Sequence, residues 1–93
     1  MKKKQQNPKT NPHLKAAFLE AVDNQLRDNN PPETGQTLER LKKEGMSDKD
    51  ARICIARVVA IETYEIMKNQ QPFNLERFVR NLNALPGEPG ISD

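Results

Sequence analysis

Few side chains in this sequence have the chemistry of a reactive or metal-binding group. Cys54 lies between Ile53 and Ile55, without the neighbouring base or the exposure that a nucleophilic thiolate needs, so a buried and inert thiol is the simpler interpretation. His13 is the one histidine. A metal site needs several ligands close together, and the remaining carboxylates are scattered over helix surfaces. The sequence therefore predicts neither a metal nor a cofactor.

Glu62 is the acid whose position is hardest to explain by solubility alone. By helical phase it lies among Ala51, Ile55 and Val58, where a carboxylate would have a raised pKa unless it is paired, and perturbed acids gather at functional sites. The alternative is structural: the side chain meets solvent, neighbours near Arg57 or a capped helix start. No second acid or base at a fixed offset and no Gly-rich phosphate loop accompany it. We therefore expect no catalytic activity.

The elements that must position these residues form one small domain. The chain has 93 residues, of which 34% are hydrophobic and 4% aromatic, which supplies a single modest core. We expect a disordered basic leader over residues 1–10, a four-helix domain over 11–85 and a disordered polar tail over 86–93. The apolar run that begins at Ile53 meets Arg57 and Glu62 too early to span a membrane. With one cysteine and no apolar stretch after the first lysines, a cytoplasmic protein is expected.

Four helix starts can be read from capping residues, which are Asn11, Asn30, Ser47 and Asn74. Proline follows each of the first two, as is common in a first helical turn, and Glu33 is placed to reach back to its cap. Phe73 is expected to pack on Phe78, and Gly45 has the backbone freedom to end the second helix. No strand-like alternation appears. The sequence thus predicts an all-α fold.

The third helix, which begins after Ser47, is apolar on three sides. One side holds Ile53, Ala60 and Tyr64, and the others hold two further sets, Cys54, Val58 and Ile61, and Ile55, Val59 and Ile66. Such a helix needs neighbours on every side. We therefore expect a long central third helix that the other three helices cover.

The first two helices carry only thin apolar stripes, so part of the third helix could stay uncovered and bind another protein or a second copy of this chain. Candidate contact residues are Tyr64, Met67 and Phe73, with ordinary core packing as the alternative for each. The leading prediction is a non-catalytic interaction module.

Nucleic-acid binding is the alternative function. The segment from Leu38 to Val58 has two helices around Gly45, as in a helix-turn-helix, and the basic residues that could contact phosphates are Lys2, Lys3, Lys4, Lys9, Lys49 and Arg52. Acidic and basic residues are equal in number between Thr10 and Leu85, however, and two carboxylates flank Lys49. The net charge of +2 belongs mainly to the leader, which argues against a phosphate-binding face on the domain.

From Asn11 to Leu85 the chain also resembles a family of small bacterial helical domains of unknown function, some of which occur beside the zinc-binding SEC-C motif. The resemblance rests on NPHL, NQLRDNNPPETGQTLERLKKEG, DARICIARVVAIETYEIM and PFNLERFVRNLNAL. It implies an all-helical fold. Members carry histidines early in the first helix and in a His-Glu-Ala-x-x-His-like pattern near the start of the third, where this chain has Lys15, Lys49 and Ile53. If those histidines bind a metal, this chain has lost the site.

Overall fold

The computed structural model describes residues 12–87, which form four helices, and within this range no strand is present. The helices are α1 (Pro12–Asp28), α2 (Pro32–Lys43), α3 (Asp48–Asn69) and α4 (Leu75–Ala84). The all-α architecture is confirmed. The leader expected over residues 1–10 and most of the expected tail lie outside the described residues.

Local sequence explains most of the helix boundaries. The hydroxyl of Ser47 accepts a hydrogen bond from the backbone N–H of Asp50 at 3.0 Å, and the side-chain oxygen of Asn74 accepts one from the N–H of Arg77 at 2.9 Å. Gly45 follows α2 with a φ of +102°, a conformation that L side chains rarely adopt. The predicted caps of α3 and α4 and the predicted stop of α2 are confirmed.

The predicted start of α2 is wrong in detail. Pro31, and not Asn30, occupies the N-cap position, and no side chain caps this helix. Glu33 does not reach back, since its Oε1 is buried without a hydrogen-bond partner among residues 12–87. Pro32 needs no N–H partner in the first turn, so the helix starts without a polar cap.

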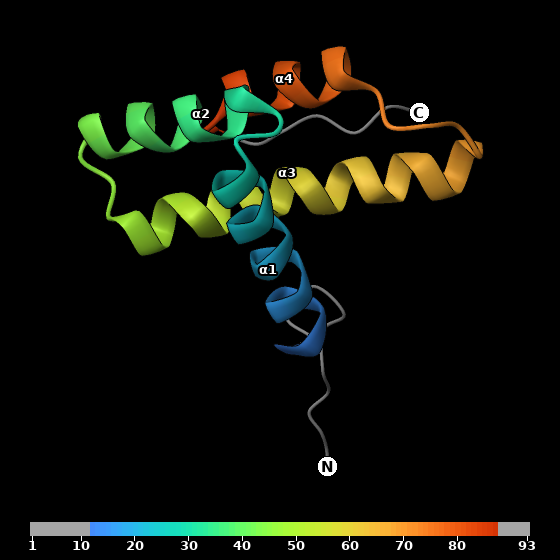
Figure 1. Cartoon of the computed structure of the whole chain (residues 1–93), viewed down its shortest axis with the longest axis horizontal. Coiled ribbons are helices and arrows are strands. Elements are labelled where there is room, and N and C mark those ends of the chain that lie inside the picture. Colours follow the sequence, from blue (N-terminus) through green and yellow to red (C-terminus); the bar gives the residue numbers. More distant parts are fainter. Residues whose placement is uncertain (1–11, 88–93) are drawn as a thin grey trace.

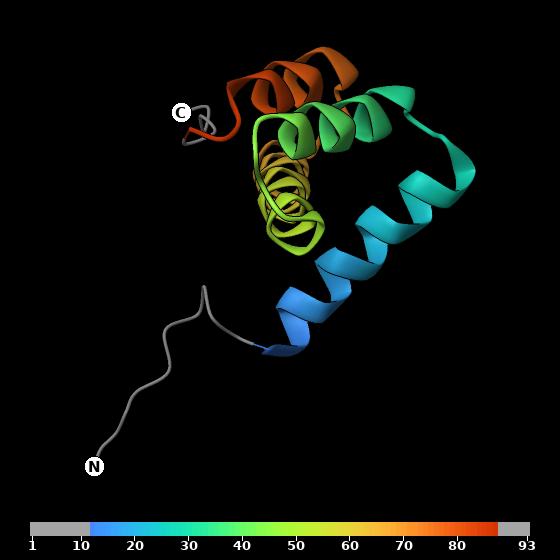
Figure 2. The same ribbon diagram turned by 90° about the vertical axis from the view of Figure 1, so that its left-hand side faces the viewer.

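The helices form two layers with α3 in contact with each of the others (Figure 1). α2 and α4 lie side by side along one side of α3, while α1 crosses a second side steeply (Figures 1 and 2). The side chains that α3 buries against these neighbours recur at three- and four-residue steps, and they include Ala51, Ile55, Val58, Glu62 and Glu65. Val22, Leu41, Phe78 and Leu82 complete the core from the other helices.

The central role of α3 is confirmed, and part of its surface is left uncovered by the other three helices (Figure 2). In the view along α3, no helix of residues 12–87 lies against its remaining side (Figure 2). Ile53 and Ala60 are half-buried there, and Tyr64 is 52% exposed. α1 crosses α3 steeply and its first half extends past α3 (Figure 1), so that Leu14, near the start of α1, is 52% exposed.

Candidate functional site

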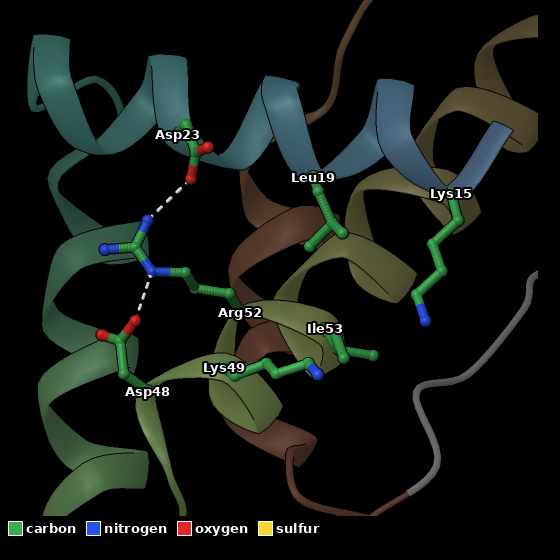
Figure 3. Close-up of a pocket in the computed structure, with 7 residues that line it drawn as sticks. All are labelled: Lys15, Leu19, Asp23, Asp48, Lys49, Arg52 and Ile53. Atoms are coloured by element: carbon green, nitrogen blue, oxygen red, sulfur yellow. Dashed lines mark hydrogen bonds and ion pairs between the residues drawn. The ribbon is translucent and has the colours of Figure 1, made fainter. Parts of the chain in front are cut away.

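A groove opens where α1 crosses the start of α3 (Figure 3). It has a volume of about 400 Å³, and its lining comes entirely from these two helices: Lys15, Leu19, Asp23, Asp48, Lys49, Arg52 and Ile53. Leu19 and Ile53 form an apolar floor, and the other side chains surround it with charge. The groove can therefore take a ligand that has both an apolar and a charged part.

Arg52 closes one end of the groove by joining the two helices (Figure 3). Its Nη1 lies 2.6 Å from Oδ1 of Asp23 on α1, and its Nε lies 2.7 Å from Oδ2 of Asp48. Nζ of Lys42 lies 3.5 Å from Oδ1 of Asp48. The hydrogen bond from Arg52 lowers the pKa of the Asp48 carboxyl, and the same bond raises the pKa of Arg52. Two carboxylates and two cations thus neutralise each other.

Lys15 and Lys49 have a different environment. Neither side chain forms a hydrogen bond or an ion pair within residues 12–87. Figure 3 shows both ammonium groups on the Ile53 side of the groove, away from Arg52. The fold brings Lys15 of α1 to the same groove as Lys49 and Ile53, which lie one turn apart on α3.

The groove does not have the composition of a metal centre. Among the described residues, no group of three or more histidine, cysteine, aspartate or glutamate side chains could hold a metal ion. His13 is exposed in the first turn of α1, and Cys54 is half-buried with its Sγ 3.9 Å from Sδ of Met46. The two groups that could act as soft ligands or nucleophiles thus lie on different helices and outside the groove lining.

The uncovered side of α3 continues from the groove. Its apolar members, spaced three, four or seven residues apart, are Ile53, Ala60, Tyr64 and Met67, and we call this set the open face. The exposed Arg57 lies on the same side, four residues after Ile53 and three before Ala60. Met67 is 72% exposed. Phe73, the third candidate contact residue, is 46% exposed and packs on Phe78 with ring centroids 5.3 Å apart. The structure thus brings Tyr64 and Met67 together on the open face, and it places Phe73 in the α3–α4 loop.

Glu62 is buried, with 2% of its surface exposed. Its carboxylate accepts hydrogen bonds from Nε and Nη2 of Arg77, both at 2.8 Å, and from the backbone N–H of Asn74 at 2.9 Å. Burial raises the pKa of this acid, but the bonds from Arg77 and Asn74 outweigh burial, so the pKa lies below its ordinary value. The carboxylate stays charged and ties α3 to the start of α4, which is a structural role.

The sequence did not predict two residues near Glu62. Arg77 was not identified as the ion-pair partner of Glu62. Glu65 was not identified as a buried acid, although it is fully buried and its Oε1 lies 3.0 Å from Nδ2 of Asn69. Glu65 could have been found from its spacing, because it lies three residues after Glu62 and therefore on the same buried face.

Of the residues predicted as nucleic-acid contacts, the structure describes Lys49 and Arg52. Lys49 and Arg52 both line the groove, but Arg52 is held between two carboxylates. Lys2, Lys3, Lys4 and Lys9 lie outside the described residues.

Comparison with protein-family models, curated protein sequences and solved structures gives no match to this chain. The resemblance to a family of small bacterial domains therefore stays a prediction. No helix among residues 12–87 is long and apolar enough to cross a membrane.

Proposed function

We propose that this chain is a non-catalytic, cytoplasmic module that binds another protein through the open face of α3. The observation that carries the proposal is the exposure of Tyr64 and Met67 in line with the half-buried Ile53 and Ala60, with the charged side chain of Arg57 on the same side of α3. Apolar side chains at this spacing form the stripe by which a helix packs on a neighbour. The described domain supplies no such neighbour on this side.

The chemistry of these residues fits recognition better than it fits a core. Tyrosine has a large apolar ring with a polar tip and contributes strongly to protein interfaces, while methionine adapts its shape to different partners. Nζ of Lys68 lies 5.3 Å from the centre of the Tyr64 ring. This cation adds a polar rim beside the apolar stripe, as is usual around the buried centre of an interface.

Site-specific photo-crosslinking tests the proposal. The photoreactive residue p-benzoyl-phenylalanine replaces Tyr64 in one variant and Leu75 in a control variant, since Leu75 is 46% exposed but lies on α4, off the open face. We expect a discrete crosslinked protein from position 64 in living cells, with a lower yield when Met67→Glu is added. Equal products from both positions, or no product from position 64, would contradict the proposal.

Sedimentation of the purified chain over a concentration series then identifies the partner type. A second copy as partner predicts a dimer that Met67→Glu dissociates. A different protein as partner predicts a monomer at every concentration together with a crosslinked product larger than this chain alone.

A further inference from the structure

The groove between α1 and α3 has features that narrow the chemistry of the partner. Lys15 and Lys49 are both exposed and both lie within the first four residues of a helix. A cation near a helix N-terminus opposes the helix dipole and costs a little stability. Neither lysine takes part in an ion pair within the described range, so both charges are available to a ligand in the groove.

The charges around the groove are complementary to a carboxylate and less so to a polyanion. Arg52 and Lys42 already neutralise Asp23 and Asp48, so the remaining charge is that of the two lysines. Figure 3 shows Leu19 of α1 and Ile53 of α3 facing each other across the groove, with both ammonium groups on the Ile53 side. A phosphate backbone has no apolar group that could pack against Leu19 and Ile53, whereas an amphipathic peptide has one beside its carboxylates.

We infer that the groove binds a carboxylate-bearing, amphipathic segment of the partner protein, whose acidic side chains pair with Lys15 and Lys49 while a neighbouring apolar side chain packs on Leu19 and Ile53. The inference rests on the proposed function, because Ile53 belongs to both the groove and the open face. A single helix of the partner can follow the open face from Met67 toward Ile53 and end with its acids in the groove. Charge then sets the orientation of the partner along α3, and the apolar contacts supply most of the affinity.

The test uses a fluorescein-labelled amphipathic helical peptide with leucines at three- and four-residue spacing and glutamates beside them. A matched peptide has glutamine in place of every glutamate. Binding to the full chain is followed by fluorescence anisotropy, and methyl NMR signals of Leu19 and Ile53 locate it. We expect the double variant Lys15→Gln, Lys49→Gln to weaken binding of the glutamate peptide by about tenfold, the loss of two partly exposed ion pairs. The glutamine peptide should bind the unaltered chain with the same reduced affinity.

Lys43→Gln is the matched control, because Lys43 is an exposed lysine outside the groove and its loss should leave binding unchanged. Equal affinity of the double variant and the unaltered chain for the glutamate peptide would overturn the inference. So would an absence of binding, or a DNA duplex that binds more tightly than the peptide and in the same lysine-dependent way. The crosslink from position 64 can persist in each of these cases, so failure of the inference is distinguishable from failure of the proposed function.

Discussion

Arg77 holds the buried carboxylate of Glu62 with two parallel hydrogen bonds, from Nε to Oε1 and from Nη2 to Oε2, each 2.8 Å long. The bidentate geometry matches the planar fork of a guanidinium to the two oxygens of a carboxylate. Glu62 lies near the end of α3, and Arg77 lies in the first turn of α4. The pair therefore fixes α4 on α3 across the intervening loop.

Glu62→Gln should lower the free energy of unfolding by about 3 kcal/mol, since it leaves the Arg77 guanidinium without its counter-charge in a largely buried position. Urea unfolding measures the loss. Glu76→Gln is the matched control, because Glu76 is an exposed acid on the same helix as Arg77, and it should change stability by less than about 0.5 kcal/mol. Equal effects of the two substitutions would show that the pair does not hold α4.

The same carboxylate should make stability depend on pH in the acid range. Its pKa in the folded chain lies below the ordinary value of 4.5, so the unfolded chain takes up a proton more readily. The contribution of Glu62 is complete above pH 4.5 and is lost as the pH falls from there through the lower, folded-state pKa. The stability difference between the unaltered chain and Glu62→Gln should therefore shrink on acidification, as urea unfolding at several pH values measures. A difference that stays constant would contradict this assignment.

Arg40 of α2 caps the C-terminal end of α4 by donating hydrogen bonds to its carbonyl groups. Its Nη2 lies 3.0 Å from the carbonyl oxygen of Leu82, and its Nη1 lies 3.0 Å from that of Leu85. A lysine cannot reach both carbonyls, so Arg40→Lys should lower the free energy of unfolding by about 1–2 kcal/mol. Arg80→Lys, at an exposed position of α4, serves as control. Hydrogen exchange should show faster exchange in the last turn of α4 for Arg40→Lys alone.

Two glycine-to-alanine substitutions should change the stability of the fold in opposite directions. Gly45→Ala places a side chain at a φ of +102° and should destabilise the fold by about 1–2 kcal/mol. Gly35→Ala lies inside α2, where the new methyl group would be 3.9 Å from Cδ2 of Leu26, an ordinary contact. It should stabilise the fold by up to about 1 kcal/mol because alanine favours a helix. Thermal unfolding followed by circular dichroism measures both, and a shift in the same direction would contradict the backbone argument.

Arg52→Met removes the ion pairs at the closed end of the groove. The residues involved are partly exposed, so the loss should be small, about 1 kcal/mol, and should diminish at high salt. Its local effect should be larger, with faster hydrogen exchange in α1 than in α2 or α4. Uniform acceleration in all helices would show that Arg52 does not hold α1 on α3.

Local sequence signals predicted the elements well. Ser47, Gly45 and Asn74 act within a few residues of their own position, so their roles follow from helix chemistry alone. The prediction that Asn30 caps α2 was wrong, because Pro31 occupies the N-cap position and the helix begins at Pro32 without a side-chain cap. The unusual apolar content of α3 identified it as the central helix, and the helical phase of Glu62 placed it on the buried face.

The contacts between helices could not be predicted in the same way. Glu62 meets Arg77 because of how the α3–α4 loop turns, and Lys15 approaches Lys49 because of how α1 crosses α3. Crossing angles depend on how the surfaces of two helices fit, which the spacing of apolar residues in one helix does not determine. The sequence predicted that part of α3 could stay uncovered near Tyr64 and Met67. It did not predict how far the uncovered surface extends, because the apolar count of a helix does not reveal how much of its surface a steeply crossing neighbour covers.

The first half of α1, which extends past α3, determines how freely the groove can change its width. Residues 12–17 are exposed on the protruding end of the helix (Figure 2), and the Arg52–Asp23 ion pair holds α1 further along the chain. A helix end with few packed neighbours opens locally at a low free-energy cost, without unfolding the core. The end of α1 that carries Lys15 can therefore move, while Lys49 lies on α3, the helix that contacts all the others. The groove can thus accommodate side chains of different size through movement of α1 alone.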